Sequence, residues 1–161
     1  MHFDCIPLIS TYTMASARAN SVAKARKEVE LAVRVVNSPA AVQEVLSALA
    51  ARGLNVLAYC TYTERDDLVI LLVTDDALIA KDALQSAGFS CKANSVVLVG
   101  ASHELGSTAI IGAHLGVSGV EILYSYASRL GGDQSIAVFK TTDDERAIQA
   151  LEICPQAQAA A

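Results

Sequence analysis

The chain repeats one order of helix-like and strand-like stretches, and this internal repeat restricts its fold more than any other feature. Gly53 and Gly119 lie about 66 residues apart, and each follows a stretch with apolar residues at helical spacing. After each glycine come a segment rich in strand formers, a polar loop, a second strand and a pair of aspartates, Asp75-Asp76 or Asp143-Asp144. The repeated order predicts an α+β fold of two ferredoxin-like β-α-β-β-α-β units.

The first copy opens with a strand that leads directly into a helix. Apolar residues alternate over residues 29–35, which predicts a half-buried strand, and helical spacing follows from about 39 to 52. Asn37 or Ser38 is the candidate cap of this helix, and Pro39 fits its first turn. A helix start of this kind presents free N–H groups that suit a carboxylate, although an ordinary capped turn explains the same pattern.

The second copy is incomplete at its end. Helix-like spacing runs to Leu151, but no convincing fourth strand follows it. Either the tail forms a stub of strand, or residues 5–9 fold back along an edge of the sheet, where Pro7 is tolerated. The resulting domains are an N-terminal extension (1–27), a first unit (28–93), a second unit without a recognisable last strand (94–154) and a flexible tail (155–161).

Composition excludes several classes of protein. A hydrophobic fraction of 53% is ample for a core, and the net charge of -5 argues against nucleic acid as the main partner, because phosphate binding needs a basic face. No apolar run is long enough to cross a bilayer, which argues against a membrane partner. The N-terminus lacks the basic start of a signal peptide, and four dispersed cysteines without a CxxC pair favour reduced thiols. We therefore expect a cytoplasmic protein.

These stretches resemble the ACT domain family, a small βαββαβ module that binds amino acids and regulates metabolic enzymes. The family's usual signature is a strand followed by Asn-x-Pro-Gly and a hydrophobic residue at the start of the first helix. The segment from Asn37 to Pro39 matches this signature, but Ala40 replaces the glycine. The corresponding segment of the second copy keeps Gly106 but not the Asn and Pro. The resemblance covers about 28–154 and implies two tandem ACT domains.

The resemblance also implies where an amino-acid effector would bind: between two modules, near the first turn, the start of the first helix and the start of the second strand. Gly106 keeps the second turn open, whereas Ala40 adds a side chain to the first, so we expect the second site to be stronger. N–H groups at the helix start would hold the ligand carboxylate, and Glu104 or Glu121 would meet its amino group, above an apolar floor of Val120 and Ile122. Carried over by position, the ligand-binding residues are Asn37, Ser38, Ala40, Ala41, Asn55 and Val56 in the first copy, and His103, Glu104, Gly106, Ser107, Glu121 and Ile122 in the second.

Other groups of reactive side chains favour structural roles. His103, Glu104 and His114 are too few for a metal site, and no nucleophile accompanies His103. The aspartate pairs precede helices, where capping explains them. We therefore expect no catalytic residue, no metal and no cofactor. Four tyrosines favour packing or an interface over base stacking, namely Tyr59, Tyr62, Tyr124 and Tyr126.

Two classes of function remain open. The first is a non-catalytic amino-acid-binding regulatory protein whose output passes through a metabolic enzyme, another regulator or an oligomer. The second is a structural or protein-interaction module with vestigial ligand sites, as Ala40 and the absent strand indicate. Exposed sheet edges and a strongly apolar chain favour a homodimer.

Overall fold

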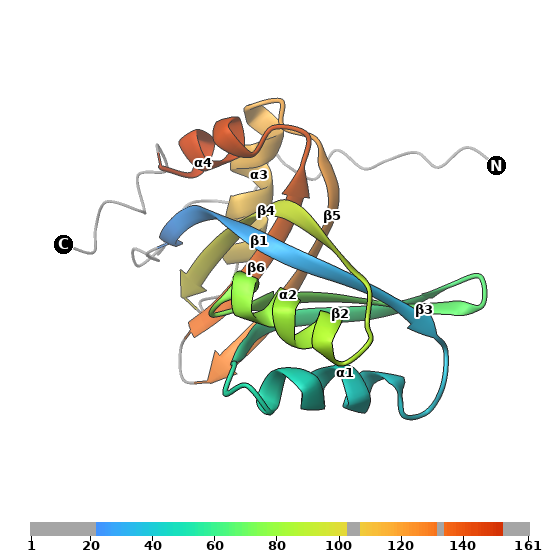
Figure 1. Cartoon of the computed structure of the whole chain (residues 1–161). Coiled ribbons are helices and arrows are strands. Elements are labelled where there is room, and N and C mark those ends of the chain that lie inside the picture. Colours follow the sequence, from blue (N-terminus) through green and yellow to red (C-terminus); the bar gives the residue numbers. More distant parts are fainter. Residues whose placement is uncertain (1–21, 103–106, 132–133, 153–161) are drawn as a thin grey trace.

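The chain folds into a six-stranded sheet flanked by helices (Figure 1). This computed structural model describes residues 22–102, 107–131 and 134–152. None of the helices in these ranges is long and apolar enough to cross a membrane. In chain order the elements are β1 (Val22–Val36), α1 (Ala41–Ala50), β2 (Val56–Glu64), β3 (Asp67–Thr74), α2 (Ala77–Ser86), β4 (Cys91–Ser102), α3 (Ser107–Val117), β5 (Ile122–Gly131), β6 (Gln134–Thr141) and α4 (Asp144–Glu152).

The sheet is antiparallel throughout and strongly curled. Its strand order is β2-β3-β1-β4-β6-β5, so β2 and β5 are the edges. Across the concave side, β2 contacts both β5 and β6. The helices α1 and α2 cover one end of the sheet, and α3 and α4 cover the other (Figure 1). The α+β prediction is confirmed.

Side-chain alternation along the central strands divides the core into three clusters. Leu31 of β1 faces α1 and α2 in the first cluster, and Val97 of β4 faces α3 and α4 in the second. Val96 and Leu98 point to the opposite side and join the third cluster, which fills the concave interior. Both faces of the central strands are therefore covered over much of their length.

The strand β1 serves both ends of the sheet. Its second half, from Glu30 to Val36, pairs with β3, whereas its pairing with β4 begins at Val22. The first half of β1 therefore lies beside β4-β6-β5 as the fourth strand of that group. Residues 22–27, predicted to be an extension, belong to the sheet. The sequence left two candidates for the last strand of the second unit, a stub of strand from the tail and residues 5–9, and both lie outside the described residues. The start of β1 fills that position instead.

The strand β4 is also continuous across the predicted boundary between the two units. It runs from Cys91 to Ser102, across the boundary that the sequence placed between residues 93 and 94. Its first part pairs with β1 near Val33, and its last part pairs with β6. The two predicted units therefore share both central strands and have no linker between them.

Glycines end the helices where the repeat predicts. Gly53 has φ of 72°, and the N–H of Leu54 donates to the carbonyl of Leu49 at 3.3 Å. Gly119 has φ of 66°, and the following N–H donates to the carbonyl of Leu115 at 3.1 Å. This left-handed C-terminal cap suits glycine because it has no Cβ. The prediction that both glycines end helices is confirmed.

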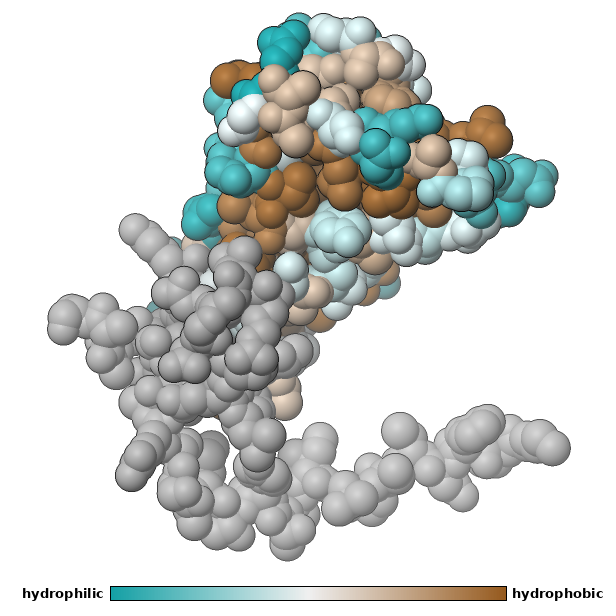
Figure 2. All heavy atoms as spheres, turned by 90° about the horizontal axis from the view of Figure 1, so that it is seen from below, coloured by the Kyte–Doolittle hydropathy of each residue, from teal (hydrophilic) through white to brown (hydrophobic). Residues whose placement is uncertain are grey.

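The described surface is not uniformly polar. Val36, Leu78 and Val117 are 77%, 82% and 92% exposed. The view from below in Figure 2 shows apolar residues in brown exposed among polar residues in teal. Apolar surface of this kind marks candidate contacts with other molecules.

Candidate functional site

The start of α1 is the first predicted ligand turn, and no side chain caps it. The N-cap position is Ala40, and the first helical N–H, that of Ala41, donates to the carbonyl of Ser38 at 3.2 Å. Asn37 turns instead toward the β2–β3 hairpin, where its amide donates to Thr63 Oγ1 at 3.4 Å. The prediction that Asn37 or Ser38 caps α1 is therefore wrong. N–H groups of the first turn are left without a side-chain acceptor.

Alanine fits the backbone at the first turn without strain. Ala40 has φ of -91° and ψ of -14°, a right-handed conformation open to any residue. Compared with the glycine of the ACT signature, Ala40 therefore adds only a Cβ at this position.

Asn55 and Val56 follow the C-terminal end of α1, whereas the turn at 37–41 lies at its start. Ten helical residues span about 15 Å, so the chain does not bring these two residues to the turn at 37–41. Asn55 is held by Asp75, whose carboxylate accepts from the Asn55 backbone N–H and side-chain amide at 3.0–3.3 Å. Val56 pairs with Thr74 in the sheet. The structure thus separates the two parts of the first predicted site.

The second predicted ligand turn is only partly visible. His103, Glu104 and Gly106 lie outside the described residues, and Ser107 begins α3. Glu121 and Ile122 are separated from Ser107 by the length of α3, which repeats the arrangement at α1. Val120, expected in the ligand floor, is buried in the core under α3 and α4.

The aspartate pairs divide their roles, and capping explains one member of each. Asp76 accepts from the N–H groups of Leu78 and Ile79 at the start of α2, at 3.0 and 2.9 Å. Asp143 accepts from the N–H of Arg146 at 3.0 Å at the start of α4. The predicted capping role is confirmed for these two residues.

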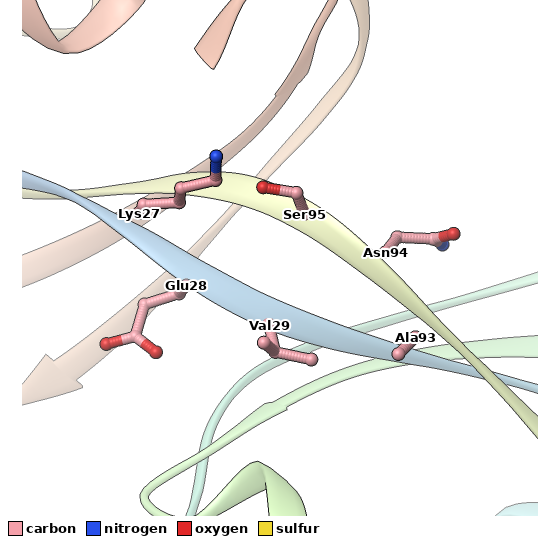
Figure 3. Close-up of a pocket in the computed structure, with 6 residues that line it drawn as sticks. All are labelled: Lys27, Glu28, Val29, Ala93, Asn94 and Ser95. Atoms are coloured by element: carbon pink, nitrogen blue, oxygen red, sulfur yellow. The ribbon is translucent and has the colours of Figure 1, made fainter. Parts of the chain in front are cut away.

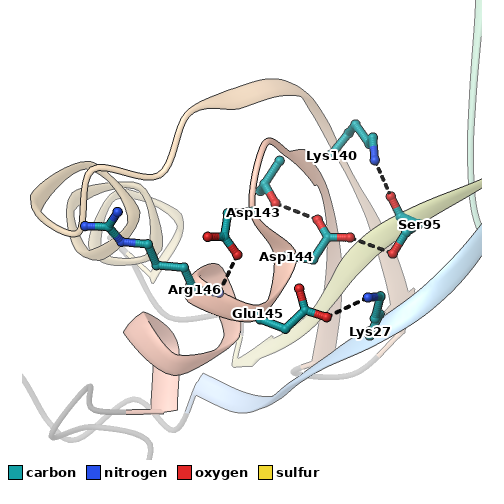
Figure 4. Close-up of polar contacts among 8 residues, drawn as sticks. Lys27, Ser95, Lys140, Asp143, Asp144, Glu145 and Arg146 are labelled. Atoms are coloured by element: carbon teal, nitrogen blue, oxygen red, sulfur yellow. Dashed lines mark hydrogen bonds and ion pairs between the residues drawn. The ribbon is translucent and has the colours of Figure 1, made fainter.

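Asp144 instead forms a buried polar network with the sheet (Figure 4). Its carboxylate accepts from Ser95 Oγ and from Thr141 Oγ1, both at 2.6 Å. Burial acts to raise the pKa of Asp144, but the two hydroxyl donors outweigh it and the net pKa is lowered. Beside this network, Lys27 pairs with Glu145 at 2.7 Å. These contacts fix α4 to β1 and β4 and leave no polar group of Asp144 waiting for a ligand.

A hollow of about 430 Å³ lies along the middle of β1 and β4 (Figure 3). The side chains around it do not converge: Figure 3 shows Lys27 and Glu28 pointing in opposite directions. Polar groups that bind a small molecule point toward a common centre, so this hollow lacks the geometry of a specific site. Its lining residues are Lys27, Glu28, Val29, Ala93, Asn94 and Ser95.

A buried carboxylate inside the curl was not predicted. Glu30 is fully buried, and its Oε2 accepts from the Tyr126 hydroxyl at 2.9 Å. Its Oε1 accepts from the Tyr124 hydroxyl and from the Asn94 amide. Burial, together with the Glu30 carboxylate, raises the pKa of both tyrosines far above the usual range, so both remain donors. The network joins β1, β4 and β5.

This network is satisfied by the chain itself. Each carboxylate oxygen of Glu30 has a donor, so the cluster stabilises the interior and offers no open position to a substrate. The two-residue spacing of Tyr124 and Tyr126 on one strand face was the available sequence signal. Tyr59 and Tyr62 differ from them, because they are 49% and 45% exposed on the edge strand β2.

The described residues hold no cluster of reactive groups. Within these ranges no group of three or more His, Cys, Asp or Glu side chains is placed to hold a metal ion. Cys60 and Cys91 are half-buried free thiols, and burial raises the pKa of Cys91. A raised pKa disfavours the nucleophilic thiolate.

No protein-family model matches the chain, and no curated protein matches it in sequence. Solved structures do match its fold. Protein BT0572 from Bacteroides thetaiotaomicron superposes with a TM-score of 0.70 at 22% identity, over 83% of this chain and 89% of that one. The ligand-free regulatory subunit of aspartate kinase from Thermus thermophilus gives 0.59 at 17% identity, over 82% of this chain and 97% of that one.

A third match is a putative C-terminal regulatory domain of aspartate kinase from Porphyromonas gingivalis W83. Its TM-score is 0.53 at 16% identity, over 83% of this chain and 94% of that one. These likenesses support an ACT-like α+β fold. Two of the three matched structures are regulatory parts of an enzyme and not its catalytic part.

Proposed function

We propose that this chain is a non-catalytic, amino-acid-binding regulatory protein of the cytoplasm, built from two tandem ACT modules. The observation that carries the proposal is the likeness to the aspartate kinase regulatory subunit, which extends over 97% of that subunit. In this proposal the first module runs from β1 to β4, and the second borrows the start of β1 as its last strand. The output passes to a metabolic enzyme or another regulator.

The helix starts support a ligand carboxylate at the first turn of a module. Aspartates occupy the starts of α2 and α4, whereas α1 has no side-chain cap. A carboxylate at the start of α1 would meet free N–H groups and the positive end of the helix dipole. Because the start of β2 lies at the far end of α1, another module must complete the site. This requirement agrees with an effector bound between modules.

A thermal-shift screen of the twenty amino acids tests the proposal. A ligand that binds only the folded state raises the melting temperature, by the equivalent of about 2.7 kcal/mol at a hundred times its dissociation constant. We expect one small amino acid to do so. No shift with any of the twenty would favour an interaction module with vestigial sites.

Calorimetric titration of two variants then tests the two turns. Gly106→Val should abolish binding, because a side chain there would crowd the ligand, and Ala40→Val should reduce binding less. Ala50→Val is the matched control, since Ala50 is exposed on α1 away from the turn. Equal losses from both turn variants would contradict a dominant second site.

The alternative function is a protein-interaction module. The open hollow with diverging side chains favours it, because polar groups that bind a small molecule point toward a common centre. Binding of any amino acid in the thermal-shift screen would exclude this alternative.

A further inference from the structure

The helices α1 and α3 occupy equivalent places in the repeat, so their outward faces can be compared position by position. Val45 and Leu49 of α1 are fully buried, and Ile111 and Leu115, each 66 residues later, are buried in the same way under the second end of the sheet. Both helices end in the same glycine-capped turn. The faces turned away from the core therefore correspond.

The outward face of α1 is polar and that of α3 is not. Between Ser107 and Val117 there is no Asp, Glu, Lys or Arg. Each of the other three helices carries at least one charged side chain. At matched positions, Gln43, Glu44, Ser47 and Ala50 of α1 become Ala109, Ile110, Ala113 and Gly116 of α3.

The described residues give no packing reason for the two glycines inside α3. A Cβ added at Gly112 or Gly116 would meet no atom within 4 Å, and neither residue has a positive φ. Glycine destabilises a helix interior relative to alanine, so a position with room for a side chain gains nothing from it internally. Their four-residue spacing places both on one side of the helix, where they would let another backbone approach closely.

Larger apolar side chains are also exposed at this end of the sheet. Val117, at the end of α3, is 92% exposed, and Leu123, near the start of the edge strand β5, is 55% exposed. The matched Leu57 of β2 packs instead against the interior cluster. The second end of the sheet thus exposes apolar groups that the first end covers.

We propose that this face, formed by the outward side of α3 and the start of β5, is where a second copy of the chain packs, with α3 against α3. A two-fold contact brings the same patch onto itself, and small uncharged residues are complementary to themselves. Two chains of net charge -5 repel each other, and α3 brings no Asp, Glu, Lys or Arg to the contact, its one basic residue being His114. Whether an amino acid binds does not enter this inference.

The outward face of α3 is large enough for the centre of a dimer interface, but it is too small to form the whole interface. An eleven-residue helix is about 16 Å long and 10 Å wide, whereas a stable dimer buries about 800 Å² on each partner. The start of β5 supplies further apolar area at the same end of the molecule. We therefore expect a dimer centred on α3 with β5 at its margin.

Sedimentation equilibrium of the full chain across micromolar concentrations tests the inference. The parent chain should reach twice its mass of 16.9 kDa. Gly116→Glu should raise the dimer dissociation constant at least about tenfold, because it places a charge in the contact. Gly116→Ala, which cannot harm helix formation, should raise it less.

Ala50→Glu is the matched control, because it adds the same charge at the equivalent position of α1 and should leave the dimer intact. Circular dichroism would verify that each variant is folded. A monomeric parent chain would overturn the inference, as would equal weakening by the two glutamate variants. A dimer unaffected by Gly116→Glu would place the contact elsewhere and would also overturn it.

Discussion

Glu30 and Val96 occupy equivalent positions on the two central strands, 66 residues apart, yet their surroundings differ completely. Glu30 is a buried carboxylate held by Tyr124, Tyr126 and Asn94. Val96 lies in the apolar interior cluster, where Ala58, the counterpart of Tyr124, also lies. The repeat preserves the backbone arrangement while one interior position is polar and the other is not.

This difference shows what the polar position contributes. An apolar interior tolerates several packings, whereas a buried carboxylate must find its donors. The tyrosines of β5 reach Glu30 only if the sheet curls far enough to bring β5 over β1. The network therefore stabilises the curled arrangement, in which β5 lies over β1.

A second difference lies at the ends of β3 and β6, the second strands of the two hairpins. Thr141, the last residue of β6, donates to Asp144. Thr74, the last residue of β3, is also buried, but its hydroxyl has no partner among the described residues. Asp144 is the first residue of α4, and the first residue of α2 is Ala77, whose side chain has no hydrogen-bond acceptor. The two threonines are a natural pair for measuring what this polar network contributes.

Removal of Glu30 should give the largest effect. Glu30→Ala leaves two half-buried tyrosine hydroxyls and a half-buried amide without their acceptor, and should lower the free energy of unfolding by about 3–5 kcal/mol. Urea unfolding measures it. Glu28→Ala, on the same strand and paired only with exposed Arg26, should cost about 0.5 kcal/mol or less.

The triple variant Glu30→Leu, Tyr124→Phe, Tyr126→Phe sharpens this prediction. It removes both tyrosine hydroxyls together with their acceptor, and should recover most of the loss because only the half-buried Asn94 amide still lacks its acceptor. A single Glu30→Ala loss below about 1 kcal/mol would show that the network contributes little.

Replacement of Asp144 should have a smaller effect that depends on pH. Asp144→Ala should lower the free energy of unfolding by about 2 kcal/mol near neutral pH, since Ser95 and Thr141 lose their acceptor. The folded pKa of Asp144 is below that of the unfolded chain, about 3.9. Its contribution is therefore present above pH 4 or so and is lost as the pH falls through the folded pKa. Unfolding of both proteins from neutral to acidic pH should show the difference shrinking, and a constant difference would contradict the role of the carboxylate.

The two threonines should give the smallest effects, with opposite signs. Thr141→Val should destabilise by about 1 kcal/mol, because it removes a donor to Asp144. Thr74→Val should stabilise by a similar amount, about 1 kcal/mol, because it removes an unpaired buried hydroxyl. Thermal unfolding measures both, and changes of the same sign would show that the repeat is not equivalent here.

Local signals in the sequence were sufficient to predict where these helices begin and end. Gly53 and Gly119 end their helices because only a left-handed residue closes such a turn, and Asp76 and Asp143 cap the next helices through their own side chains. The interior carboxylate was not predictable in this way. The alternation around Glu30 indicates a strand with one polar face, and only the curl of the whole sheet buries Glu30 on that face.

The candidate ligand site was predictable only as a set of positions. The cap of α1 failed because Asn37 contacts the β2–β3 hairpin, a partner 26 residues away. Residues 22–27 were assigned to an extension because their charges hide the strand pattern, whereas pairing with β4 decides their structure. Both errors come from contacts distant in sequence.

The shared strand β1 has a consequence for synthesis. Its first half leaves the ribosome before β4, and its partners on β4 follow roughly 70 residues later, about 4–14 s at ordinary rates of translation. During that interval the first half of β1 is a strand without its partner on β4. Arg26, Lys27 and Glu28 are charged, and such residues discourage pairing with a neighbouring nascent chain. The first half of β1 thus waits for a partner strand that is made later.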